Sequence, residues 1–111
     1  MKARLSLSLL GILCSPSLVA SESNGKVIDY WIHNTHDSFA FSVENQTGRP
    51  SCATYGNPTG RYVVDTRTQS GKLVVSAVMA AKASGANISA VGQGKCDYYI
   101  DSEDLLYLRA Y

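Results

Sequence analysis

The chain lacks both an excess and a cluster of basic residues. Its 111 residues include ten Lys and Arg against nine Asp and Glu, and only 17% of them are charged. Proteins that bind nucleic acid by counterion release, or that bind anionic membranes, concentrate Lys and Arg along one segment or one face. The sequence therefore argues against nucleic acid and against a membrane surface as partners.

Long apolar runs are also missing. The N-terminal run, residues 5–13, is shorter than the roughly 20 residues that a transmembrane helix needs. It follows the basic residues Lys2 and Arg4 and precedes a segment of small residues at 19–21. A basic start, a short apolar run and small residues in this order are typical of a signal peptide for export.

Cleavage of this signal peptide is expected after Ala20 or after Ser21, and the second site places Val19 and Ser21 at the two positions that a signal peptidase reads. We assign residues 1–21 to the signal peptide and residues 22–111 to one small domain. A retained membrane anchor and a lipidated cysteine are the alternatives. The exported part has eight basic against nine acidic residues, a net charge of about −1.

Cysteine is scarce, and its positions are informative. Of the three cysteines, Cys14 lies in the predicted signal peptide, so that Cys52 and Cys96 are the only pair in the exported part. Because export moves the chain into an oxidising compartment, we predict a disulfide between these two residues. It would close a loop of about 44 residues and stabilise the domain by about 2–4 kcal/mol.

The exported part predicts β strands interrupted by a single helix. Runs rich in β-branched and aromatic residues, bounded by turn residues, predict strands at residues 26–33, 38–43, 61–65, 87–91 and 104–109. In the second of these, Phe39, Phe41 and Val43 alternate with small residues. The helix is predicted to begin after Thr68, a suitable N-cap, and to end at Gly85.

Five short strands with a helix between the third and the fourth match the element order of the OB-fold, a small Greek-key barrel. The fold class is therefore mainly β with one helix. An open α+β antiparallel sheet with one covering helix has the same element order and is the alternative.

Constellations of catalytic or metal-ligating residues are missing. His33 and His36 have no third ligand nearby, and no serine lies in a Gly-x-Ser-x-Gly context. Four acidic residues are interpreted as solvated turn residues, with a small hydrolase as the alternative: Asp97, Asp101, Glu103 and Asp104. We expect no catalytic residue, no metal and no cofactor.

Aromatic residues, by contrast, are numerous for so small a domain. They include Tyr30, Trp31, Tyr55, Tyr62, Tyr98, Tyr99, Tyr107 and Tyr111. Rings beside Asn, Asp and Ser side chains can stack on sugars and accept sugar hydroxyls, and the same residues suit a protein interface. Trp31, Tyr98 and Tyr99 are the candidate ligand contacts.

Several segments together resemble a group of small exported bacterial proteins: residues 50–54, 61–66, 70–85 and 91–96, followed by 101–103. Those proteins are similar to the B subunits of AB5 toxins of the subtilase cytotoxin and pertussis toxin class. The resemblance implies an OB-fold, a homopentamer, glycan binding and a possible toxin A subunit as partner. No residue of the toxin glycan pocket can be matched to this chain.

Together these observations predict a secreted or periplasmic module that binds a glycan or a cell-surface receptor without catalysis. The alternative is a periplasmic protein-binding module, such as an inhibitor of an envelope enzyme.

Overall fold

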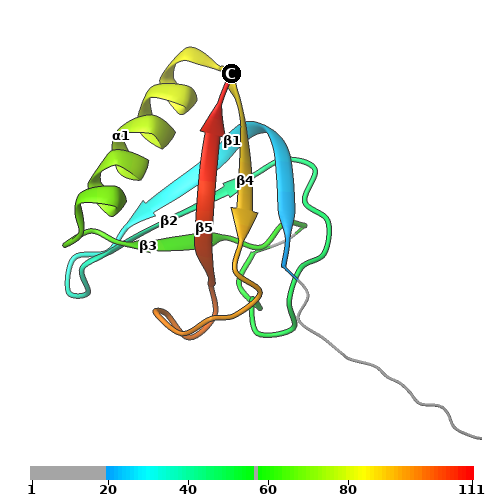
Figure 1. The fold of residues 1–111 in the computed structure, drawn as a ribbon, viewed down its shortest axis with the longest axis vertical. Helices are drawn as coiled ribbons and strands as arrows, with labels where there is room; N and C mark the ends of the chain where they lie inside the picture. The colour runs from blue at the N-terminus through cyan, green and yellow to red at the C-terminus, as the bar shows by residue number, and fades with distance from the viewer. Residues whose placement is uncertain (1–19, 57) are drawn as a thin grey trace, which may run out of the picture.

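The computed structural model describes residues 20–56 and 58–111, in which five strands close into a barrel with the neighbour order β1-β2-β3-β5-β4 (Figure 1). The elements are β1 (Glu22–Ile32), β2 (Ser38–Val43), β3 (Tyr62–Asp65), α1 (Gln69–Ser84), β4 (Asn87–Gly92) and β5 (Glu103–Ala110). This is the OB-fold topology that the sequence predicts, and closure rules out the open sheet. The predicted signal peptide lies outside the described residues except for its last two.

The barrel closes through β1, which pairs with two different strands. Its first half pairs antiparallel with β4, from Glu22 opposite Val91 to Lys26 opposite Asn87. Its second half pairs with β2, after a register shift that follows Val27. Strands β3 and β5 are the parallel pair, and they complete the ring.

Strand β1 begins four residues earlier than the predicted strand at residues 26–33. The residues missed are polar and contain Gly25, so they carry no β signal in the sequence. They are extended because they pair with β4, and the hydroxyl of the fully buried Ser23 hydrogen-bonds the Tyr62 hydroxyl at 2.6 Å. Here tertiary pairing overrides local propensity.

The core fills the barrel with aromatic and branched side chains. Its largest fully buried members are Tyr62, Phe39, Phe41, Ile88, Val43 and Val78. All six residues of β2 are buried, including Ser38, Ala40 and Ser42, because β2 lies between β1 and β3. The alternation in the sequence therefore separates large from small side chains rather than buried from exposed ones.

Helix α1 covers one end of the barrel and has the predicted caps (Figure 1). The Thr68 hydroxyl accepts a hydrogen bond from the Gly71 N–H at 2.9 Å, and Gly85 ends the helix in the left-handed conformation with φ of 73°. Gly71 also allows close packing, since a Cβ there would lie 1.9 Å from the Asp65 carbonyl oxygen. Among the described residues no helix is long and apolar enough to cross a membrane.

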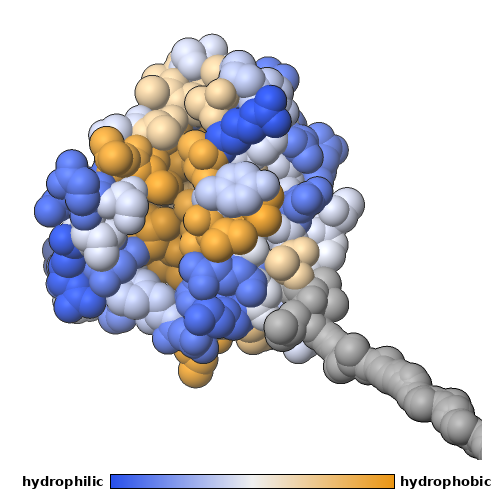
Figure 2. Space-filling view, in the orientation of Figure 1, coloured by the Kyte–Doolittle hydropathy of each residue, from blue (hydrophilic) through white to orange (hydrophobic). Residues whose placement is uncertain are grey.

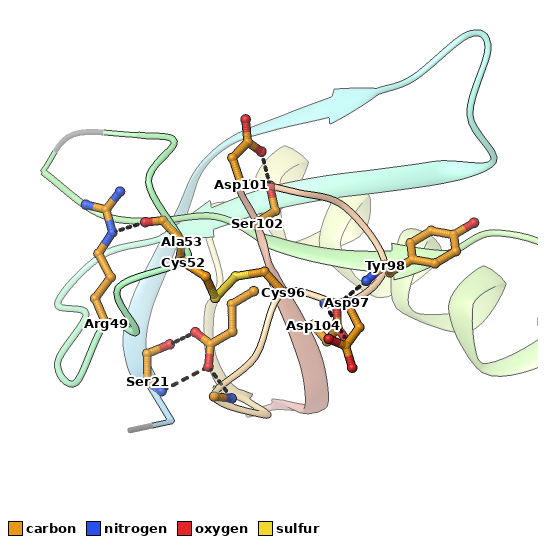
Figure 3. Close-up of a disulfide and its surroundings, with 12 residues drawn as sticks. Ser21, Arg49, Cys52, Ala53, Cys96, Asp97, Tyr98, Asp101, Ser102 and Asp104 are labelled. Carbon is orange, nitrogen blue, oxygen red and sulfur yellow. Dashed lines mark hydrogen bonds between the residues drawn. A yellow bond between two sulfur atoms is a disulfide. The ribbon is translucent and has the colours of Figure 1, made fainter. Parts of the chain in front are cut away.

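The predicted disulfide is confirmed. Cys52 and Cys96 are bonded, with 6.0 Å between their Cα atoms and a sequence separation of 44 residues (Figure 3). The bond joins the loop before β3 to the loop after β4, and α1 lies within the segment that it encloses. It therefore ties together two segments of the chain that are distant in the sequence.

Replacing both cysteines by alanine (Cys52→Ala with Cys96→Ala) is expected to lower the free energy of unfolding by about 2–4 kcal/mol, because the unfolded chain gains the entropy of an open loop. Urea unfolding followed by the fluorescence of Trp31 measures the change. Wild-type protein with the disulfide reduced is the control. It should unfold at about the same urea concentration as the double-alanine variant, because both lack the bond. Two free thiols found by alkylation of the native exported protein would contradict the bond.

Candidate aromatic binding site

The three candidate contacts are brought to one side of the barrel. Trp31 lies near the end of β1, and Tyr98 and Tyr99 lie in the loop between β4 and β5. The turn between β1 and β2 reaches this loop, since Tyr99 Oη is 2.9 Å from His33 Nε2. The His36 ring lies between the two tyrosines, with its centroid 4.9 Å from that of Tyr98 and 5.1 Å from that of Tyr99.

Both tyrosines of the pair are partly buried and contact the same histidine. Adjacent residues on a regular strand would point to opposite faces. The segment instead bends before Tyr99, which makes an isolated bridge to Ser102. As a result, Tyr98 and Tyr99 both line the same surface, and the Tyr98 hydroxyl donates to the Asp37 carbonyl at 2.6 Å.

Arg61 connects this cluster to the rest of the site. Its guanidinium carbon lies 3.8 Å from the ring centroid of Tyr55, 4.8 Å from that of Trp31 and 5.8 Å from that of Tyr99. A cation over ring faces is attracted by their quadrupoles, and more strongly where water is excluded. Arg61 is itself buried, so its charge acts on these rings with little screening.

Arg61 also has hydrogen-bond acceptors and a carboxylate that compensates its charge. Its Nε–H donates to Ser102 Oγ at 2.7 Å, and its Nη2 pairs with the Asp101 carboxylate at 3.2 Å. Ser102 Oγ donates in turn to Asp101 at 3.0 Å (Figure 3). This network holds the guanidinium plane in one orientation and thereby orients the rings that pack on it.

Sequence reasoning missed Tyr55 and Arg61 as site residues. Tyr55 lies in a loop without periodicity, and only its stacking on Arg61 and its edge-to-face contact with Trp31, at 5.5 Å and 84°, place it in the site. A basic residue directly before the apolar run at 62–64 is the one signal that could have indicated Arg61. We call the six rings of Trp31, His33, His36, Tyr55, Tyr98 and Tyr99 the aromatic face.

A small cavity adjoins the aromatic face at Trp31 and Tyr55. Its volume is about 240 Å³, and its other lining residues are Ile28, Asp29, Ser42, Gly56, Pro58 and Thr59. The Asp29 carboxylate accepts a hydrogen bond from the Ser42 hydroxyl at 2.6 Å and keeps further acceptor capacity. The cavity thus combines aromatic rings with hydroxyl and carboxylate groups.

A larger cavity, of about 470 Å³, lies between α1, β3 and β5. Its lining is mostly apolar and includes Val64, Leu73, Leu106 and Tyr107, and Figure 2 shows an orange hydrophobic area on the face that carries these elements. Of the three candidate contacts only Tyr98 lines it. No sequence pattern indicates this cavity, because it forms where α1 packs against the barrel.

Charges beside Tyr98 shift two pKa values. Hydrogen bonds from the Arg67 side chain and backbone lower the pKa of Asp65 from 3.8 to about 2. Burial raises the pKa of Tyr98 above its usual value, and the negative charge of Asp65 raises it further. The Tyr98 phenol is therefore neutral at physiological pH and keeps the hydrogen that it donates to the Asp37 carbonyl.

The four acidic residues at 97–104, two in the β4–β5 loop and two at the start of β5, do not form one cluster. Asp101 pairs with Arg61, and Asp104 accepts the backbone N–H of Tyr98 at 3.0 Å. The interpretation of these residues as solvated is wrong for Glu103, which is fully buried. Within the part of the chain that the structure describes, no three His, Cys, Asp or Glu side chains gather as a metal site, and His33 and His36 belong to the aromatic face.

The comparisons with known proteins returned nothing for this chain: no family model, no curated protein and no solved structure matches it.

Substituting Arg61 by lysine is expected to lower the free energy of unfolding by about 1–3 kcal/mol, because an ammonium lacks the planar group that stacks on Tyr55 and the Nε–H that bonds Ser102. Urea unfolding measures the loss. Arg67→Lys is the matched control: its side chain is 65% exposed, and a much smaller change is expected. Equal effects of the two substitutions would contradict the organising role of Arg61.

Proposed function

We propose that the protein is a secreted or periplasmic glycan-binding module that acts without catalysis, in the manner of an AB5 toxin B subunit. The observation that carries the proposal is the arrangement of Trp31 and Tyr55, two exposed or half-exposed rings held edge to face beside a cavity of about 240 Å³ that also contains polar groups. The disulfide suits an oxidising destination outside the cytoplasm.

The chemistry of this arrangement suits a sugar. A pyranose ring presents C–H groups that stack on aromatic faces, and its hydroxyl groups need hydrogen-bond acceptors and donors nearby. Trp31 and Tyr55 supply the faces, while Asp29 and Thr59 supply an acceptor and a hydroxyl. Because Arg61 already orders both rings, binding would cost little side-chain entropy.

Tyr55→Ala is expected to weaken binding of any sugar that the wild type selects on a glycan array by about tenfold or more, since it removes one stacking face at the cavity. Trp31 is the only tryptophan, so its fluorescence reports the titration. Tyr111→Ala is the control, because this tyrosine is 63% exposed at the C-terminus and lies outside the aromatic face. The control should bind as the wild type does.

A glycan array without a hit, together with elution of the mature protein as a monomer, would contradict the proposal. Binding that Tyr55→Ala leaves unchanged would also contradict it, because the sugar would then occupy a different surface.

A protein partner is the second candidate function, and the large apolar cavity between α1 and β5 favours it. Leu73, Leu106 and Tyr107 expose 62%, 58% and 53% of their surface on this side. Contiguous apolar surface of this kind is typical of protein interfaces. The partner would be further copies of this chain, as in a B-subunit ring, a toxin A subunit, or an envelope enzyme that the module inhibits.

Leu106→Asp is expected to disrupt such an interface, because it places a charge in the apolar area. Light scattering of the eluted mature protein measures the mass of any oligomer, and co-purification measures binding of an envelope enzyme. Ile100→Asp is the control, since Ile100 is 84% exposed and lies outside the cavity. A wild type that is monomeric and retains no partner would contradict this second candidate.

A further inference from the structure

Glu103 is the most deeply placed acidic residue that the structure describes. It is fully buried, and it lies so close to Gly92 that a Cβ on that glycine would be 2.0 Å from Glu103 Oε2. None of the ion pairs among the described residues includes it, and Arg61 is engaged by Asp101. A buried carboxylate without a compensating charge is strongly unfavourable.

The hydrogen-bond partners of Glu103 come chiefly from Ser21. The Ser21 N–H donates to Oε2 at 3.2 Å, and the Ser21 hydroxyl donates to Oε1 at 2.5 Å. The third donor is the Gly94 N–H, at 2.8 Å from Oε2. Figure 3 shows Ser21 with the dashed lines of its two bonds.

Ser21 is itself held firmly although it precedes β1. Its carbonyl accepts the Gly92 N–H at 2.9 Å, its Oγ lies 2.9 Å from the Tyr62 hydroxyl, and the Gln46 amide donates to that Oγ at 3.3 Å. Ser21 is fully buried, whereas the preceding Ala20 is exposed. Among the described residues, the buried part of the barrel therefore begins at Ser21.

We infer that Ser21 is the first residue of the mature protein and that its α-ammonium group forms an ion pair with Glu103. The inference rests on the predicted export signal. Signal peptidase would add water across the Ala20–Ser21 peptide bond, leaving a carboxylate on Ala20 and an amine on Ser21 that takes up a proton. The nitrogen that now lies 3.2 Å from Glu103 as an amide would then carry a full positive charge.

The structure and the residue preference of signal peptidase favour cleavage at different peptide bonds, so the N-terminal residue distinguishes the two. Cleavage after Ser21 fits the small residues that the enzyme reads, Val19 and Ser21. That cleavage would remove two of the three donors to Glu103 and leave only Gly94. Cleavage after Ala20 keeps all three and adds the charge that the buried carboxylate lacks.

The first test is to export the full chain from a bacterial host and to determine its N-terminus by intact mass and Edman sequencing. Ser21 is expected as the first residue. A chain that begins at Glu22, at any other residue, or at the uncleaved Met1 would overturn the inference.

The second test is a double-mutant cycle for the ion pair. All elements of the fold lie within residues 22–110, so two mature chains are prepared by removing a cleavable fusion partner: one begins at Ser21 and one retains Ala20. Each is made with and without Glu103→Gln, and urea unfolding is measured. Retaining Ala20 is expected to raise the unfolding equilibrium constant about tenfold with Glu103 and to change it little after Glu103→Gln.

Glu22→Gln is the matched control for the cycle, because its exposed carboxylate is adjacent to the same terminus. Its coupling to the N-terminal change should be small. A coupling between Glu103 and the terminus below about threefold overturns the ion pair, as does a coupling equal to that of Glu22.

If Glu103→Gln does not fold, the amine is tested directly in the two chains with Glu103. An ion pair keeps the amine protonated, and only the neutral amine reacts with an acylating ester. Acylation of the Ser21 amine at neutral pH, located by peptide mass spectrometry, should be at least about tenfold slower than acylation of the Ala20 amine, which corresponds to one pKa unit. Equal rates would overturn the ion pair.

Discussion

Closure of the barrel by β1 is the constraint on which the other features depend. The strand must pair with β4 along residues 22–26 and with β2 along residues 27–32, so it bends between the two sheets. Gly25 makes the bend possible, because its φ is 148° and a Cβ there would lie 2.8 Å from the Glu44 carboxylate. Each half of β1 then leads to a different part of the molecule: Ser21 at one end, and Trp31 with the histidine turn at the other.

Two buried charges follow from the parallel pairing of β3 with β5. Tyr62 is opposite Glu103 in this pair, and the Glu103 N–H donates to the Arg61 carbonyl at 3.1 Å. The side chains of Arg61 and Glu103 nevertheless have different partners. Arg61 is neutralised by Asp101 and supports the rings of the aromatic face, whereas the partners of Glu103 are Ser21 and Gly94. Buried charges that are held by hydrogen bonds in this way favour one arrangement of the surrounding loops.

Local signals predicted the elements well. Thr68 and Gly85 bound the helix as predicted, and β2 matches its predicted range, because caps and alternating patterns act within a few residues. The disulfide was predictable for a different reason, since only one pair of cysteines follows the predicted export signal. Three residues of the aromatic face were candidate ligand contacts from the sequence: Trp31, Tyr98 and Tyr99. Arg61 and Tyr55 were not identified, because their contacts join segments that are far apart in the chain.

The sequence by itself determined the order of the elements along the chain, the helix ends and the covalent bond between Cys52 and Cys96. These depend on residue type, on short-range spacing and on the number of cysteines. Only the tertiary structure decided that the aromatic residues gather around Arg61 and that Glu103 is buried against Ser21. Such juxtapositions arise when the barrel closes, and closure brings together side chains as distant in the sequence as those of Ser21 and Glu103, which are 82 residues apart. No pattern along the chain records which of its acidic and aromatic residues will meet.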